Sequence, residues 1–511
     1  MEQEYSNYDI KHNINSCDTL ITNASAVIPK VGIVDTNILI EDGKIKALTN
    51  SVIDNISASR KIDARGKYVL PGAIDPHVHY GVYTPIDEAA KSESRSAAIG
   101  GVTTMMRMLR LYDNYHNNII RQLQASKGTH YIDYSIHASI LRLEQVRDIR
   151  YLKEVGVNSF KIYMNLGANL NHIYMDLEPG THGVKDREVN MTDDLLSAIV
   201  REGSKVDSAT TILVHAEDPA ICSEQMRLGK EKGLQGLKAW SDCRPPTSEV
   251  KSIAKVSELA RTVEGGANLY FVHIGSNAAL DAILAQKEKG KSNYYIETCP
   301  HYLTHTTDFG NVTGKVMPPI RSKSDLQSMW SALRNGIIDT IGTDHVANRL
   351  DVKIGNARVE GGGRGDDDIW SALAGFPGVA TMLPVLLSHG VNQNRISIER
   401  VAEVTSYNTA RIFGMYPKKG TIQKGSDADL TIVDLELEKK VTPELLQSYS
   451  DYTIYDGWRL EGWPVMTIVR GKIVMEDGQV NNDALGHGEF VARPVIAANE
   501  EEVDDDNNAA T

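Results

Sequence analysis

Five side chains of the kind that bind divalent metal ions each close a short apolar run in this sequence: His77, His79, His215, His273 and Asp344. His77 and His79 flank a single valine. Residues two apart on a strand point to the same face, so both imidazoles can reach one cation. Imidazole and carboxylate ligands suit zinc, and three or four of them leave room for a water molecule. We interpret the set as the active site of a metal-dependent hydrolase.

The apolar runs before these residues are predicted to be strands of a barrel. Short β-branched runs alternate with helix-length segments over roughly 340 residues, which favours a (β/α)8 barrel over a doubly wound sheet. Side chains at the C-terminal ends of barrel strands converge on one face, where such enzymes have their active sites. Strands are expected at 69–75, 101–107, 133–139, 159–164, 211–215, 269–273, 293–298 and 339–343.

Both ends of the chain carry hairpin patterns outside this barrel, with Asp42-Gly43 as one predicted turn. We expect the two ends to join into one β domain. The predicted fold class is therefore α/β, a (β/α)8 TIM-like barrel with a small β-sandwich domain built from both chain ends. The expected boundaries are a flexible tail at 1–17, the β-sandwich domain at 18–68 and 415–495, the barrel at 69–414, and an acidic disordered tail at 496–511.

Composition argues against several classes of function. The chain of 511 residues has 54 basic and 67 acidic side chains, and its formal net charge of −13 argues against a nucleic-acid partner. We found no apolar run of about 18 residues and no basic segment leading into an apolar one, so neither a membrane span nor a signal peptide is expected. The four cysteines form no close pair and predict no disulfide framework. We expect a cytoplasmic protein.

An ordered set of motifs resembles the amidohydrolase superfamily, within its cyclic amidohydrolase branch of hydantoinases, dihydropyrimidinases, allantoinases and dihydroorotases. One His-x-His is a weak signal because histidine pairs are more often structural, whereas the whole set in this order is highly specific. The likeness runs from about residue 18 to residue 490. The matches are Leu-Pro-Gly-Ala-Ile-Asp-Pro-His-Val-His (70–79), Ser-Phe-Lys-Ile-Tyr-Met (159–164), Val-His-Ala-Glu (214–217), Cys-Arg-Pro-Pro (243–246), Glu-Thr-Cys-Pro-His-Tyr-Leu (297–303), Met-Pro-Pro-Ile-Arg (317–321), Gly-Thr-Asp-His (342–345) and Lys-Gly-Ser-Asp-Ala-Asp-Leu (424–430).

This resemblance implies a pair of divalent metal ions, with zinc as the leading candidate, and a bridging hydroxide that attacks the carbonyl carbon of a cyclic amide. A lysine ammonium has no lone pair, so Lys161 could bridge the ions only after CO2 converts it to an anionic carbamate, N6-carboxylysine. A snorkelling or ion-paired lysine is the alternative for this residue. The implied ligands are His77, His79 and Asp344 on one ion, His215 and His273 on the other, and Lys161 between them.

Asp344 is also the candidate catalytic residue, because it can accept a proton from the attacking hydroxide and return it to the leaving nitrogen. A turn or N-capping aspartate is the alternative. Near the ligands, Asp75 could orient an imidazole, as carboxylates often do for metal-bound histidines. His301 follows a strand end and could support the ligands. His345 is a candidate substrate contact, with support of the ligands and plain packing as the alternatives.

Three positions depart from the relatives' recognition patterns. Leu166 stands where hydantoinases and dihydropyrimidinases have a tyrosine that steadies the oxyanion, and Met317 stands where they have a serine. Gly81 stands where dihydroorotases have an arginine for the substrate carboxylate. The substrate therefore cannot be copied from these relatives. Unless an arginine elsewhere substitutes, we expect a neutral hydantoin, dihydropyrimidine or cyclic imide with an apolar substituent, and Met317 as one of its contacts.

The stretch 166–190 is longer than the corresponding hydantoinase loop. It follows the strand of Lys161 and should therefore emerge on the active face of the barrel. His172, Tyr174 or His182 could supply the donor of the missing tyrosine. A solvated surface loop is the alternative, with equal weight.

Two other functions stay open. The same hydroxide would serve an acyclic amide, a carbamate or a urea. A non-catalytic dihydropyrimidinase-like scaffold is the other alternative, although such scaffolds lose metal ligands and this sequence retains every ligand position. Because the relatives are commonly tetramers or dimers, we expect a homotetramer or homodimer that acts on a small molecule, with no nucleic-acid or membrane partner.

Overall fold

The computed structural model describes residues 16–50, 56–206, 209–355 and 368–493. The acidic tail expected at 496–511 lies outside the described residues, as does most of the tail expected at 1–17. Ser16 and Cys17, which the prediction placed in that tail, belong to the first strand.

A parallel sheet of short, buried strands forms the centre of the molecule. Its strand order is β15-β14-β13-β12-β9-β8-β7-β6-β16, and all neighbouring strands in this order pair in parallel. Strands buried on both faces have near-continuous apolar sequences, which is why these runs could be found from the sequence. The bounds are β6 (Ala73–His79), β7 (Val102–Leu109), β8 (Asp133–Ser139), β9 (Ser159–Tyr163), β12 (Thr211–His215), β13 (Asn268–Phe271), β14 (Asn293–Thr298), β15 (Thr340–Ile341) and β16 (His345–Val346).

The sheet closes on itself through one interrupted strand. β15 and β16 lie at opposite ends of the strand order but are separated by only three residues of chain. β15 pairs with β14, and β16 pairs with β6. The residue between them that carries the candidate carboxylate, Asp344, has a φ of 51°. The eighth barrel strand therefore bends at Asp344, at the point where the ring is completed.

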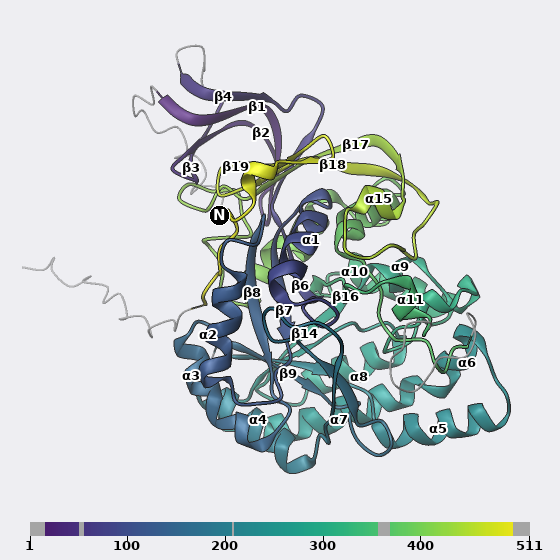
Figure 1. Ribbon diagram of the computed structural model, residues 1–511. Helices are drawn as coiled ribbons and strands as arrows, with labels where there is room; N and C mark the ends of the chain where they lie inside the picture. The colour runs from purple at the N-terminus through teal and green to yellow at the C-terminus, as the bar shows by residue number, and fades with distance from the viewer. Residues whose placement is uncertain (1–15, 51–55, 207–208, 356–367, 494–511) are drawn as a thin grey trace, which may run out of the picture.

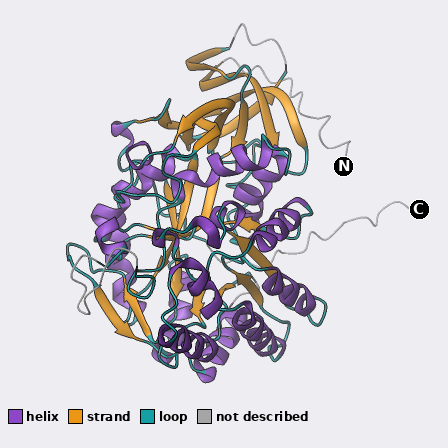
Figure 2. Ribbon diagram, turned by 90° about the vertical axis from the view of Figure 1, so that its right-hand side faces the viewer, coloured by secondary structure: helices purple, strands orange, loops and turns teal. Residues whose placement is uncertain are grey.

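Helices follow the strands and surround the sheet (Figures 1 and 2). Several have clear start signals, such as the capping box of Ser322 and Asp325 at α10 and the first-turn prolines of α5 and α7. The bounds are α1 (Ile86–Ile99), α2 (Tyr115–Ser126), α3 (Asp148–Glu154), α4 (Asp193–Val206), α5 (Pro219–Glu231), α6 (Gly236–Cys243), α7 (Pro246–Arg261), α8 (Asn277–Lys287), α9 (Pro300–Thr304), α10 (Lys323–Arg334), α11 (Leu350–Lys353), α12 (Met382–Val385), α13 (Ile398–Ala402), α14 (Asn408–Ile412) and α15 (Pro443–Leu446). No helix among the described residues is long and apolar enough to cross a membrane.

The two ends of the chain build a second sheet above the barrel, where Figure 1 shows the purple strands β1–β4 beside the yellow strands β17–β19. Its order is β20-β19-β18-β17-β5-β1-β2-β3, with β4 paired to β1. The (β/α)8-type fold and the separate sheet from both chain ends are therefore confirmed, and all strands of that sheet except β4 follow one continuous path. The bounds are β1 (Ser16–Ile28), β2 (Gly32–Glu41), β3 (Lys44–Thr49), β4 (Ser57–Asp63), β5 (Tyr68–Pro71), β17 (Leu430–Lys440), β18 (Arg459–Val469), β19 (Lys472–Glu476) and β20 (Gln479–Val480).

Gly72 joins the two sheets, because β5 ends just before it and β6 begins just after it. A Cβ atom at this position would lie 2.2 Å from Oγ1 of Thr103, so no larger residue fits without a shift of the chain. The stretch 166–190 contains a β-hairpin rather than a plain loop: β10 (His172–Met175) pairs with β11 (Lys185–Glu188).

Candidate metal centre and active site

The first cluster of candidate ligands consists of His77, His79 and Asp344. The two histidines end β6, and Oδ1 of Asp344 lies 3.2 Å from Nε2 of each. Their ligand atoms all lie within 4.8 Å of one another, and all three residues are buried. The closeness of His77 and Asp344, 267 positions apart, follows from ring closure, which places the bend after β15 against the end of β6.

The second cluster consists of His215, which ends β12, and His273, which follows β13. Nδ1 of His215 and Nε2 of His273 are 3.0 Å apart. The ring centroids of His77 and His273 are 5.4 Å apart, so the two clusters share one space. His273 has a φ of 45°, which turns the chain as it leaves β13.

Lys161 lies on β9 with no exposed surface, and its Nζ has no hydrogen-bond partner among the described residues. Burial lowers the pKa of Lys161 to about 7, against the opposing effects of Glu297 and Asp344. An ion pair, the alternative considered for this lysine, is absent from the described residues. The side chain is also too deeply buried to reach solvent, which excludes snorkelling in this geometry.

Two buried glutamates fix the orientation of ligand imidazoles. Oε1 of Glu297 lies 2.8 Å from Nδ1 of His77, and the carboxylate also accepts hydrogen bonds from the His273 backbone N–H and from Tyr270 Oη. Since both carboxylate oxygens act as acceptors, the hydrogen of His77 sits on Nδ1 and its Nε2 lone pair faces Asp344.

Glu217 holds His215 in a similar way. Its Oε2 lies 2.6 Å from Nε2 of His215, and Arg244 donates to the two oxygens at 2.9 and 2.8 Å. Burial alone would raise the pKa of Glu217, but Arg244 and His215 reverse this and hold it below its usual range. The lone pair of His215 is thereby placed on Nδ1, toward His273.

Neither glutamate was predicted from the sequence, which pointed to Asp75 as the carboxylate that could orient an imidazole. Asp75 accepts hydrogen bonds from the backbone N–H groups of His77 and Thr343 and from Thr343 Oγ1. It therefore supports the ligands through the backbone, by tying β6 to the chain just before Asp344, and no hydrogen bond to an imidazole is found among the described residues. Two signals could have revealed the glutamates: Glu217 lies two residues after His215, and Glu297 lies near the end of an expected strand.

The chemistry of this donor set fits divalent metal ions. Burial lowers the pKa of His77, His79 and His273 well below the usual value, and neighbouring cationic groups add to the effect. The imidazoles are therefore neutral and offer lone pairs. Nδ1 of His79, Nδ1 of His273 and Nζ of Lys161 are buried without a hydrogen-bond partner among the described residues. Bound cations would use such lone pairs.

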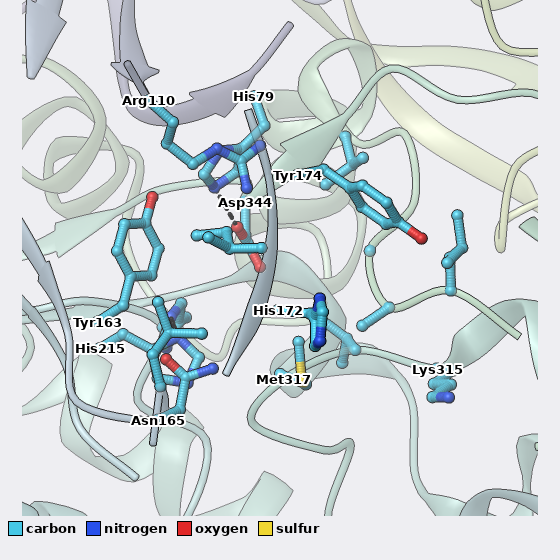
Figure 3. Close-up of a pocket in the computed structure, with 18 of the residues that line it drawn as sticks. His79, Arg110, Tyr163, Asn165, His172, Tyr174, His215, Lys315, Met317 and Asp344 are labelled. Carbon is cyan, nitrogen blue, oxygen red and sulfur yellow. Dashed lines mark hydrogen bonds and ion pairs between the residues drawn. The ribbon is translucent and has the colours of Figure 1, made fainter. Parts of the chain in front are cut away.

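A cavity of about 260 Å³ opens onto these ligands (Figure 3). Its lining supplies polar groups that the sequence analysis did not single out, among them Arg110, Tyr163 and Asn165. The Oδ1 atom of Asn165 is buried without a hydrogen-bond partner among the described residues. Arg110 follows the end of β7, a position at which barrel enzymes commonly place functional residues.

The cavity includes three of the five predicted substrate contacts, His172, Tyr174 and Met317. His182 does not line it: its side chain is 65% exposed and lies 3.5 Å from Glu88. His345 does not line it either. It is fully buried, with Nε2 facing Glu93 at 2.9 Å and Nδ1 accepting from the Gly378 backbone N–H. These two predictions of substrate contact were wrong.

His345 instead supports the strand that follows Asp344. A supporting role of His301 toward the ligands stays a prediction. It is buried in α9 beside Phe376, outside the cavity lining, and its Nε2 has no hydrogen-bond partner among the described residues.

Comparison with known proteins agrees with this architecture. Residues 68–474 match the amidohydrolase family, which is most of the barrel and part of the second sheet. The chain belongs to the amidohydrolase family. Within the family it is similar to an L-hydantoinase of Paenarthrobacter aurescens, with 32% identity over 489 residues that cover 93% of this chain and 98% of the relative. It is also similar to a D-hydantoinase of Ralstonia pickettii, with 29% identity, 93% of this chain and 99% of the relative covered.

Solved hydantoinase structures have the same fold as this family member. One D-hydantoinase superposes with a TM-score of 0.81 at 28% identity, covering 94% of this chain and 99% of the other. The L-hydantoinase (dihydropyrimidinase) from Arthrobacter aurescens superposes with a TM-score of 0.80 at 31% identity, covering 93% and 100%. The likeness extends over both the barrel and the sheet from the chain ends.

Proposed function

We propose that this amidohydrolase opens a cyclic amide, such as a hydantoin, a dihydropyrimidine or a related cyclic ureide or imide. The observation that carries the proposal is the convergence of His77, His79, His215, His273 and Asp344 around Lys161 at the floor of one cavity. The similarity to hydantoinases over nearly the whole chain supports the cyclic substrate. Bound as a pair, divalent ions such as zinc would supply an activated water molecule and polarise the amide carbonyl.

We propose that His77, His79 and Asp344 hold one ion, that His215 and His273 hold the other, and that Lys161 bridges them as a carbamate. The neutral amine of Lys161 would attack the carbon of CO2, form an N–C bond and release its proton to water. Burial favours this step because it lowers the pKa of the lysine to about 7, so the amine is substantially neutral near that pH. The product has two oxygens that share one negative charge, where the free amine had no hydrogen-bond partner among the described residues.

Asp344 is placed to move the proton of the reaction. Its Oδ1 lies beside both imidazoles of β6, and the residue lines the cavity. It would accept the proton of the attacking water and deliver it to the amide nitrogen as the C–N bond breaks. Glu217 and Glu297 keep the imidazoles in one orientation throughout, which avoids a reorganisation cost during the reaction.

The test is hydrolysis by zinc-loaded protein of hydantoin, dihydrouracil, a cyclic imide, dihydroorotate and allantoin, with an N-carbamoyl amino acid and a simple urea as acyclic comparisons. We expect ring opening that Asp344→Asn abolishes. The matched control is Asp351→Asn, whose side chain is 59% exposed and lies outside the cavity lining. Turnover of only the acyclic compounds would replace the cyclic substrate with the acyclic alternative. Absence of both turnover and bound metal would indicate a scaffold protein.

A further inference from the structure

Arg110 is a cation that faces the candidate active site, and its side chain has no hydrogen-bonded carboxylate partner among the described residues. It follows β7 and lines the same cavity as His79 and Asp344, and Figure 3 shows it reaching from its strand toward these residues. Its side chain is 13% exposed, and its nearest carboxylate oxygen, Oδ2 of Asp176, is 4.0 Å from Nε. The Nε atom is buried with no hydrogen-bond partner among the described residues.

Asp176 gives this guanidinium only a long ion pair of 4.0 Å, because the oxygens of its carboxylate already accept hydrogen bonds from other donors. Its Oδ1 accepts from the buried side chain of Arg107, and its Oδ2 accepts from the backbone N–H of Arg110 at 2.7 Å. The backbone N–H of Asp176 in turn donates to the carbonyl of Arg110 at 3.0 Å. The backbone of Arg110 is therefore fixed to the end of the β10 strand while its side-chain donors stay available to the cavity.

The same contacts explain why position 81 carries glycine. A Cβ atom on Gly81 would lie 2.3 Å from Nη2 of Arg107 and 3.0 Å from Oδ1 of Asp176. Gly81 also has a φ of 98°, which side-chain-bearing residues rarely adopt. An arginine cannot fit there. The sequence predicted a neutral substrate ring on the condition that no arginine elsewhere in the chain substitutes for the missing one at position 81. Arg110 lines the cavity, so this condition is not met.

We propose that Arg110 binds a carboxylate on the substrate, so that the preferred substrate is a cyclic amide with an acidic substituent. A guanidinium in a poorly exposed cavity gains most from an anion that presents two oxygens to its fork of donors. The cavity offers none among its lining residues except Asp344, whose Oδ1 already contacts two imidazoles. The proposal rests on the proposed function, because the substrate ring must lie against the same ligands.

The opposite side of the cavity can receive the ring. Asn165 lies near His215, across from Arg110 in Figure 3, and its unpartnered Oδ1 can accept a hydrogen bond from a ring N–H. His172 and Met317 also line the cavity, where they can contact the body of the substrate. A carboxylate on Arg110 and a ring N–H on Asn165 would together orient the ring.

The experiment compares two matched substrates, 5-carboxymethylhydantoin and its carboxamide, which differ in charge but scarcely in shape. The readout is the ratio of their kcat/KM values in the wild type and in Arg110→Gln. We expect the wild type to prefer the carboxylate and the variant to lose about 100-fold of that preference, the size expected for a charged hydrogen-bonded pair. Arg121→Gln is the control, since Arg121 is 60% exposed on α2 and should leave the ratio unchanged.

Two results would overturn the proposal. One is a wild type that opens the carboxamide as well as the carboxylate. The other is an Arg110→Gln variant that loses both activities equally, because Arg110 would then support the ligands and not the substrate. If no ring is opened at all, the proposed function fails. The role of Arg110 in binding a carboxylate can then still be tested, by calorimetric measurement of the affinity of 5-carboxymethylhydantoin for the wild type and for the variant. Equal affinity in that measurement would overturn the assignment.

Discussion

Glu217→Gln tests whether buried carboxylates hold the ligand imidazoles in place. In the wild type the carboxylate lies 2.6 Å from Nε2 of His215 and accepts two hydrogen bonds from Arg244, at 2.9 and 2.8 Å. Glutamine keeps the shape but has one acceptor oxygen and no charge. The variant therefore leaves the guanidinium of Arg244, which is 2% exposed, without its counter-ion.

Two effects follow from this geometry. Removing one partner of a buried ion pair costs about 3–5 kcal/mol of stability. Because glutamine keeps one acceptor oxygen for Arg244, we expect the free energy of unfolding to fall by about 3 kcal/mol, the lower end of this range. Removing a carboxylate that orients a metal-bound histidine costs about 10–100-fold in metal affinity. We therefore expect both a lower free energy of unfolding and weaker zinc binding for Glu217→Gln.

Urea unfolding of the metal-free proteins measures the first effect, and competition with a chromogenic chelator measures the second. Glu224→Gln is the matched control, since Glu224 pairs with Arg227 on the surface of α5 and is 54% exposed. It should change neither quantity. The double variant Glu217→Gln/Arg244→Met should lose less stability than the sum of its single changes, because no unpaired charge remains. A Glu217→Gln protein with wild-type stability and zinc affinity would refute the reasoning.

Three further outcomes are expected. Lys161→Ala should lose the second metal ion and turnover, and acetate should restore part of the turnover by supplying bridging oxygens; an unmodified amine in an active, metal-loaded protein would contradict this. His172→Ala should change kcat/KM at least several-fold because the residue lines the cavity, whereas His182→Ala should not; equal effects in kinetic assays would count against the assigned cavity. Lys419→Met should lower the free energy of unfolding by about 3 kcal/mol, because it leaves the buried carboxylate of Asp429 without the side-chain cation that it contacts, while Asp133 keeps its ion pair with Arg470; unchanged urea unfolding would argue otherwise.

The barrel strands could be predicted because strands that are buried on both faces have nearly continuous apolar sequences. Expected strands at 133–139, 211–215 and 293–298 agree with the structure to the residue. The ends of these runs also located the candidate ligands, since parallel strands bring their C-terminal ends to one face. These features are local in sequence, which is why one chain sufficed to find them.

Contacts made by loops and by deeper layers could not be predicted in the same way. Glu297 contacts His77 across 220 positions, and the sequence spacing of the two residues does not predict this contact. His345 follows Asp344 directly, yet the bend at Asp344 sends its ring outward to Glu93. Arg110 escaped notice because its role depends on Asp176 being engaged elsewhere, which is a property of three-dimensional packing.

Stepwise zinc titration of the metal-free protein, with hydantoin or 5-carboxymethylhydantoin opening as the readout, tests the central claim most directly. The metal-free protein should be inactive, turnover should rise with added zinc and level off near two ions per chain, and His77→Ala should remain inactive at every point. Full turnover without metal, or a His77→Ala protein as active as the wild type, would contradict the assignment of this cavity as a metal-dependent hydrolytic site.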